Sequence, residues 1–146
     1  MQMVFEILLG KSRAEVWKAF DNPANLKKWQ PTLVSFEPVS GTPGRAGAVS
    51  RLTYREGKRR VVLTETITLR REPDEFAGTY DSGMAVNAIH NSFVALDGAR
   101  TNWIVTTDFR FAGLWILLLP VMRGAIRKRV RSDLGRFKEM LEAGQL

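Results

Sequence analysis

The chain contains no cysteine and only one histidine, His90. Without thiols it can form neither disulfides nor thiolate metal sites, and cysteine redox chemistry is excluded. A single imidazole also excludes metal sites built from several histidines. We therefore expect no metal and no cofactor. The lack of cysteine fits a cytoplasmic location, because that compartment is reducing.

Long hydrophobic runs are also missing. The longest, Leu114–Met122, has nine residues, about half of the roughly 20 that a helix needs to span a bilayer. At the amino terminus, Met1–Leu9 lacks the basic region of a signal peptide, and Glu6 interrupts its apolar run, so we interpret it as a first strand. The run at Leu114–Met122 is too short to cross a membrane but could touch one.

The residues that are present suit one globular domain, 1–146. Of these residues 45% are hydrophobic and 25% charged, which is enough apolar material for a sizeable core. The net charge is +7, and residues 112–146 hold seven basic and three acidic groups. A positive balance permits attraction to anionic lipid or nucleic acid. Because the basic hairpin 55–60 lacks interleaved aromatic residues and no DNA-reading motif is present, we expect no nucleic acid partner.

The periodicity of the chain predicts two short helices followed by strands. Ser12 and Glu15 form a capping box for a helix over 13–20, and a second helix over 26–29 stops before Pro31. From Thr32 onward apolar and polar residues alternate, which predicts six antiparallel strands joined by short loops. The turn signals lie at 40–44, 56–57, 72–74, 82–83 and 97–98.

The last segment, 112–146, reads as one long amphipathic helix. Pro120 either kinks this helix or begins its main part, since proline is tolerated in the first turn. At one position of the apolar stripe the helical spacing fits either Leu134 or Asp133. The stripe comprises Leu119, Met122, Ile126, Val130, Leu134, Phe137 and Leu141.

Several sequence segments carry a resemblance to a known family. They are Asn25–Pro31, Thr64–Ile67, Tyr80, Val86–Phe93, Thr101–Trp103 and Phe109–Phe111. Together with the order of elements, they resemble the SRPBCC or START-like superfamily, specifically its bacterial polyketide cyclase/dehydrase-type members. The resemblance implies an α+β helix-grip fold, in which a curved antiparallel seven-stranded sheet wraps around a long C-terminal helix, with two short helices after the first strand. It also implies a deep apolar pocket that binds lipids, sterols, polyketides or hormones, and that in some branches catalyses cyclisation or dehydration.

Glu65 is the most informative polar residue. Strand alternation puts it on the same face as Val61, Leu63, Ile67 and Leu69. A carboxylate among aliphatic neighbours has a raised pKa unless it finds a donor. Glu65 is therefore the candidate catalytic acid or polar anchor, and the alternative is that it pairs with an arginine or caps a loop amide.

The last strand turns Trp103, Val105 and Phe109 toward the same side, with Thr107 and Phe111 in that row. For the strand over 84–96 two registers are open, because a slip of one residue exchanges the faces. One turns Asn87, Ile89, Asn91 and Phe93 inward, and the other Val86, Ala88, His90, Ser92 and Val94. The resemblance favours the asparagine register, in which both amides need partners and His90 points outward without a role.

Three functional hypotheses follow. The first is a carrier that binds a hydrophobic small molecule, such as a lipid, a polyketide or an isoprenoid, in an internal cavity. The second is a cyclase or dehydratase that uses Glu65 as acid and base. The third is a module that contacts an anionic membrane or a partner through Leu114–Met122 and the basic helix face. The residues do not decide whether there is turnover, nor the ligand, pathway or oligomeric state. The expected ligand-binding residues are Trp29, Leu52, Tyr54, Leu63, Glu65, Ile67, Tyr80, Asn87, Asn91, Phe93, Trp103, Val105, Phe109, Leu119, Met122 and Ile126.

Overall fold

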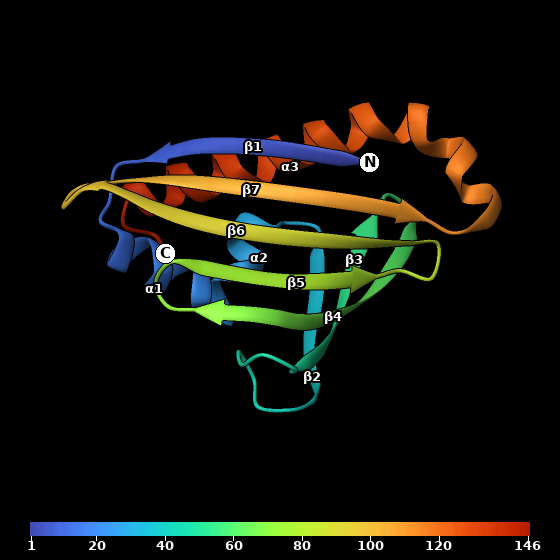
Figure 1. The fold of residues 1–146 in the computed structure, drawn as a ribbon, viewed down its shortest axis with the longest axis horizontal. Coiled ribbons are helices and arrows are strands. Elements are labelled where there is room, and N and C mark those ends of the chain that lie inside the picture. The colour runs from blue at the N-terminus through green and yellow to red at the C-terminus, as the bar shows by residue number, and fades with distance from the viewer.

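A computed structural model describes residues 1–146, and its central element is one seven-stranded antiparallel sheet (Figure 1). The strand order is β1-β7-β6-β5-β4-β3-β2, so β2 to β7 form a meander and β1 pairs with β7. Every predicted turn falls between two strands, which confirms the strand assignment. The strands are β1 (Gln2–Leu9), β2 (Leu33–Ser40), β3 (Val49–Glu56), β4 (Arg59–Arg71), β5 (Glu75–Asp81), β6 (Ala85–Asp97) and β7 (Arg100–Phe111).

Two short helices follow β1, as the sequence predicts. The first is α1 (Arg13–Asp21), and the 3-10 helix η1 (Pro23–Asn25) leads into α2 (Leu26–Trp29). The capping box is formed: Ser12 Oγ accepts a hydrogen bond from the Glu15 amide at 3.3 Å, and the Glu15 carboxylate accepts one from the Ser12 amide at 3.0 Å. These bonds satisfy amide groups that would otherwise lack partners in the first turn.

The C-terminal segment differs in part from a single long helix. Residues Gly113–Leu118 form a 3-10 helix, η2, and α3 runs from Leu119 to Glu142 with Pro120 in its first turn. Proline therefore begins the main helix rather than kinking it, since its missing amide proton costs nothing there. None of the helices combines the length and the apolar composition that a membrane-spanning helix requires.

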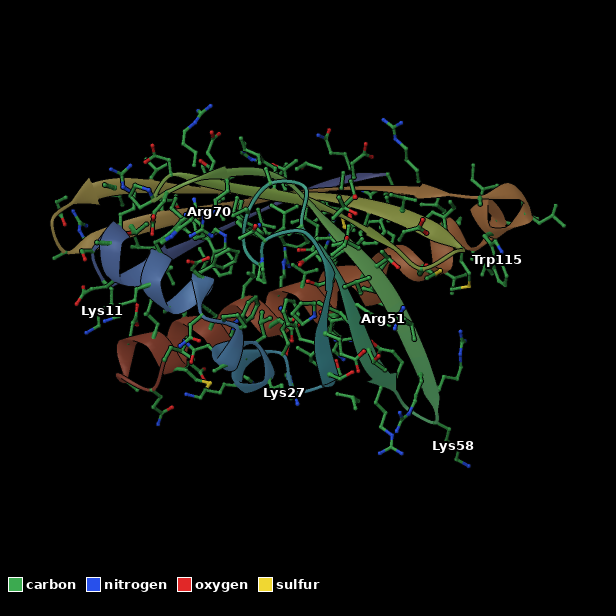
Figure 2. The ribbon with its side chains drawn as sticks, turned by 90° about the horizontal axis from the view of Figure 1, so that it is seen from below. Lys11, Lys27, Arg51, Lys58, Arg70 and Trp115 are labelled. Atoms are coloured by element: carbon green, nitrogen blue, oxygen red, sulfur yellow. The ribbon has the colours of Figure 1, made fainter.

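All three α-helices lie on the same side of the sheet, and β2, β3 and β4 bend toward that side (Figure 2). One end of the space between sheet and helices is filled with aromatic side chains. Phe137 of α3 packs against Trp103 and Trp29 with ring centroids 4.9 and 5.3 Å apart, and neither Phe137 nor Trp103 is more than 1% exposed. Each such aromatic pair adds about 0.5–1.5 kcal/mol beyond the burial of its area. This cluster fixes the C-terminal half of α3 on the sheet.

Candidate functional site

The N-terminal half of α3 does not close on the sheet but leaves a cavity of about 900 Å³. Most of the residues that line it are hydrophobic. The helix contributes Met122, Ala125, Ile126, Val130 and Leu134 to its wall. The volume lies within the range of roughly 300–1,000 Å³ that is typical of small-molecule sites.

A row of polar side chains crosses the sheet side of this cavity. Ser50 of β3 is opposite Glu65 of β4, Glu65 is opposite Tyr80 of β5, and Tyr80 is opposite Asn87 of β6. All four residues line the cavity. Residues directly opposite each other on neighbouring strands have Cβ atoms about 4.5–5.5 Å apart on the same face. The row, which we call the polar row, therefore forms one continuous strip across the sheet side of the cavity.

Glu65 is 7% exposed and forms no ion pair. Burial raises the pKa of its carboxyl group, and an interaction with the Tyr80 hydroxyl partly offsets this effect. The prediction of a raised pKa is thus confirmed, and no arginine pairs with Glu65. Burial, followed by the charge of Glu65, raises the pKa of Tyr80 well above its ordinary value. The two groups can hold or share a proton at the cavity wall.

The asparagines of β6 point inward, with Asn87, Ile89 and Asn91 lining the cavity, but the two amides differ in their bonding. Asn91 accepts a hydrogen bond from the Trp103 indole nitrogen at 3.0 Å and donates one to the Phe76 carbonyl at 3.2 Å. Asn87 Oδ1 is buried and has no hydrogen-bond partner. Asn91 therefore joins β6 to β5 and β7, whereas the Asn87 amide oxygen has no partner within the protein.

The cavity is also lined by seven charged residues that the sequence did not assign to it: Asp21, Arg45, Glu56, Arg59, Arg70, Arg129 and Asp133. Arg129 of α3 forms ion pairs with Asp133 at 3.1 Å and with Glu56 of β3 at 2.5 Å. Its guanidinium lies over the Tyr54 ring, 5.7 Å from the centroid. Burial raises the pKa of Asp133, while Arg129 opposes this shift. The position of Asp133 in the apolar stripe was the sequence signal for this cluster.

Another of these charged residues, Arg70, reaches the cavity because of a β-bulge. The pairing of β4 with β5 shifts between Ile67 and Leu69, so the alternation changes phase. Arg70 instead of Leu69 lines the cavity, and the inward placement of Leu69 was wrong. The Arg70 guanidinium pairs with Asp21 of α1 through two bonds of 2.6 and 2.8 Å. This side chain joins α1 to the sheet.

Of the sixteen residues predicted to bind a ligand, Phe93 and Leu119 do not line the cavity. Phe93 points inward as expected, but it is 2% exposed and stacks on Trp103 with centroids 5.6 Å apart in the aromatic cluster. Leu119 is the first residue of α3 and does not line the cavity. The first residue of α3 that does so is Met122. The others line the cavity: Trp29, Leu52, Tyr54, Leu63, Glu65, Ile67, Tyr80, Asn87, Asn91, Trp103, Val105, Phe109, Met122 and Ile126.

His90 lies on the outer face of β6 in the asparagine register. Its side chain is 42% exposed, and its Nε2 atom is 3.1 Å from a carboxylate oxygen of Glu75. It does not line the cavity. His90 is therefore a surface residue paired with a neighbouring strand.

A family model described as "Polyketide cyclase / dehydrase and lipid transport" matches residues 10–142. No curated protein sequence matches the chain. The match covers the two short helices, β2 to β7 and α3, and so includes every wall of the cavity.

Solved structures show the same fold at low sequence identity. An aromatase/cyclase from Streptomyces sp. R1128 has a TM-score of 0.82 at 14% identity, over 97% of this chain and 93% of that chain. Ara h 8.0201 has a TM-score of 0.81 at 17% identity, over 98% of both chains. Norcoclaurine synthase from Thalictrum flavum, in complex with dopamine and hydroxybenzaldehyde, has a TM-score of 0.74 at 10% identity, over 98% of this chain and 87% of that one. These likenesses establish the helix-grip fold.

Proposed function

The chain belongs to the polyketide cyclase/dehydrase and lipid transport family, and from this premise we propose that it binds one hydrophobic small molecule in the cavity. The observation that carries the proposal is a mostly hydrophobic cavity of about 900 Å³ whose sheet side is crossed by the polar row. Apolar area supplies affinity in such a site, and a few polar groups fix the orientation of the guest.

The polar row limits what the ligand can present to it. Asn87 Oδ1 needs a donor, since a buried acceptor without a partner costs about 1–3 kcal/mol. Glu65 offers either a donor or an acceptor, because its raised pKa favours the protonated form. A hydroxyl or phenol group meets both needs. We therefore expect a ligand with a hydroxylated end at the polar row and an apolar body against Trp103, Phe109 and Ile126.

The related proteins support this class of ligand. One solved relative is an aromatase/cyclase, and another holds dopamine and hydroxybenzaldehyde. Both compounds in the second protein carry a hydroxyl group on an aromatic ring. Identity of 14% or less transfers the fold and not the ligand, so the ligand class depends on the polar row of this chain.

Titration with the uncharged fluorescent probe N-phenyl-1-naphthylamine tests the proposal. We expect saturable binding of one probe per chain. Ile89→Trp places a larger ring inside the cavity and should weaken binding at least tenfold. Ala88→Trp, on the exposed face of the same strand, is the matched control and should bind as the wild type does. Absence of saturable binding, or equal effects of the two substitutions, contradicts a cavity ligand.

A second function is favoured by one observation, the buried carboxyl group of Glu65 beside Tyr80. In its ionised form Glu65 can remove a proton from the carbon next to a carbonyl and, once protonated, return it, and a raised pKa makes this carboxylate a stronger base. The Tyr80 hydroxyl can donate a hydrogen bond to the enolate oxygen. Exchange of the α-hydrogens of 2-tetralone for deuterium, followed by NMR, measures this step. Glu65→Gln should slow catalysed exchange by about 10²-fold or more. Wild-type exchange no faster than in buffer rules out this activity for the probe.

A further inference from the structure

The 3-10 helix η2 and the start of α3 form the most apolar exposed surface of the protein. Leu114 is 84% exposed, Leu117 71% and Val121 78%. Side chains of a 3-10 helix point in three directions, and five successive apolar residues therefore leave η2 with no polar side. We call this surface the η2 patch: Leu114, Trp115, Ile116, Leu117, Leu118 and Val121. A contiguous exposed patch of this kind marks an interaction site.

Basic side chains lie close to the η2 patch in the chain and at the tip of the hairpin toward the same end of the molecule. Residues 109–132 contain six basic side chains and no acidic one. Arg123 and Lys128, which follow the patch on α3, are exposed and form no ion pair. The tip of the β3–β4 hairpin carries four exposed cations, Arg55, Lys58, Arg59 and Arg60. Figures 1 and 2 show the hairpin tip and η2 at the same end of the long axis, with Lys58 and Trp115 labelled in Figure 2.

The cavity reaches this end of the molecule. Its lining includes Glu56 and Arg59 from the hairpin, and Phe111 and Met122, which flank the η2 patch in the chain. The apolar patch and the cations therefore border the same end of the cavity. Lys11 lies at the opposite end of the long axis and Lys27 near its middle (Figure 2).

We propose that this end of the protein docks on an anionic lipid bilayer, with the η2 patch among the acyl chains and the nearby cations at the headgroups. An apolar segment flanked by arginine and lysine is suited to the boundary between acyl chains and headgroups. The inference rests on the proposed function for its purpose, because a ligand taken from a bilayer at this end enters the cavity without crossing water.

The charge pattern favours a bilayer over a second copy of the chain. In a symmetric dimer the same patch faces itself, which would bring both sets of cations together. Such juxtaposition of like charges is unfavourable. Anionic headgroups, by contrast, neutralise the cations near the patch.

Flotation with vesicles of phosphatidylcholine alone, or of phosphatidylcholine and phosphatidylglycerol, tests the proposal. The wild type should bind anionic vesicles at least tenfold more tightly than neutral ones, and salt should weaken the binding. Leu114→Ser with Leu117→Ser should reduce binding at least tenfold, since both side chains are more than 70% exposed and the fold does not need them. Val4→Ser with Leu96→Ser, two exposed apolar residues elsewhere, is the matched control.

A second pair of double variants tests the contribution of charge. Arg123→Gln with Lys128→Gln removes two cations near the η2 patch, and Lys11→Gln with Lys27→Gln, the control, removes two cations elsewhere. Only the first pair should weaken anionic binding. Wild-type protein that stays free of anionic vesicles at low salt overturns the proposal, as does a dimer that only the Leu114 and Leu117 substitutions dissolve. If the protein binds anionic vesicles but not N-phenyl-1-naphthylamine, the proposed function fails and the docking surface stands. If it binds N-phenyl-1-naphthylamine but not anionic vesicles, only the docking proposal is rejected.

Discussion

Replacing Asn87 by leucine should stabilise the ligand-free protein and weaken ligand binding. Asn87 Oδ1 is buried without a partner in the cavity wall, and leucine has the same branched shape without a polar atom, while the adjacent cavity has room for its larger methyl groups. The unpartnered acceptor costs about 1–3 kcal/mol. We expect Asn87→Leu to recover about 1 kcal/mol of that cost. In a protein of this size, that gain corresponds to a rise of roughly 3 °C in Tm.

Asn91→Leu is the matched control on the same strand and the same face. Asn91 bonds to the Trp103 indole nitrogen and the Phe76 carbonyl, and leucine leaves the buried indole nitrogen unpartnered. At about 1–3 kcal/mol for a buried unpartnered group, the expected loss is about 2 kcal/mol. The two substitutions remove the same amide but should change stability in opposite directions.

Urea unfolding followed by tryptophan fluorescence measures both changes, with the midpoint compared at equal slope. Titration of both variants with a hydroxylated aromatic compound measures the change in ligand affinity. If Asn87→Leu destabilises the protein as much as Asn91→Leu does, then Asn87 has a structural partner and our reading of it as a ligand contact is wrong.

Three further predictions concern the acid, the aromatic cluster and the first helix. Burial raises the pKa of Glu65 above its ordinary value of 4.5, so the folded state binds the carboxyl proton more tightly than the unfolded state does. This proton binding contributes stability that is fully present below pH 4.5 and is lost as the pH rises through the pKa of the folded state. The free energy of unfolding of Glu65→Gln should therefore fall less than that of the wild type between pH 4.5 and 8; parallel profiles would contradict this. Phe137→Ala should cost about 3–5 kcal/mol in urea unfolding, since Phe137 is fully buried, and a loss below 1 kcal/mol would show that α3 is held elsewhere. Ser12→Ala should cost about 1 kcal/mol by the same assay through loss of the capping box, and an unchanged midpoint would deny that role.

The sequence was sufficient for the order of elements and for much of the cavity wall. Turn residues and alternation marked β2 to β7, and Ser12 with Glu15 marked the start of α1. These signals are local, so they do not depend on how distant segments meet. The inward face of β6 followed from the family resemblance, because alternation alone allows both registers.

What the sequence did not predict depends on contacts between distant segments. The polar row exists because the strand registers bring Ser50, Glu65, Tyr80 and Asn87 opposite one another, and pairing register is not readable from one strand. Arg70 lines the cavity because of the β-bulge between Ile67 and Leu69, and no residue type in β4 indicates that bulge. Phe93 was assigned to the cavity because alternation gives its direction, but not whether neighbouring rings fill the space in front of it.

Native mass spectrometry of the gently purified protein tests the central claim, that the space between sheet and α3 holds a guest. We predict that part of the wild-type protein carries the added mass of one small molecule, or that it takes up one molecule of N-phenyl-1-naphthylamine. The added mass should be absent from Ile89→Trp and present in Ala88→Trp. A wild type that shows only the bare chain mass and takes up no probe would contradict the account.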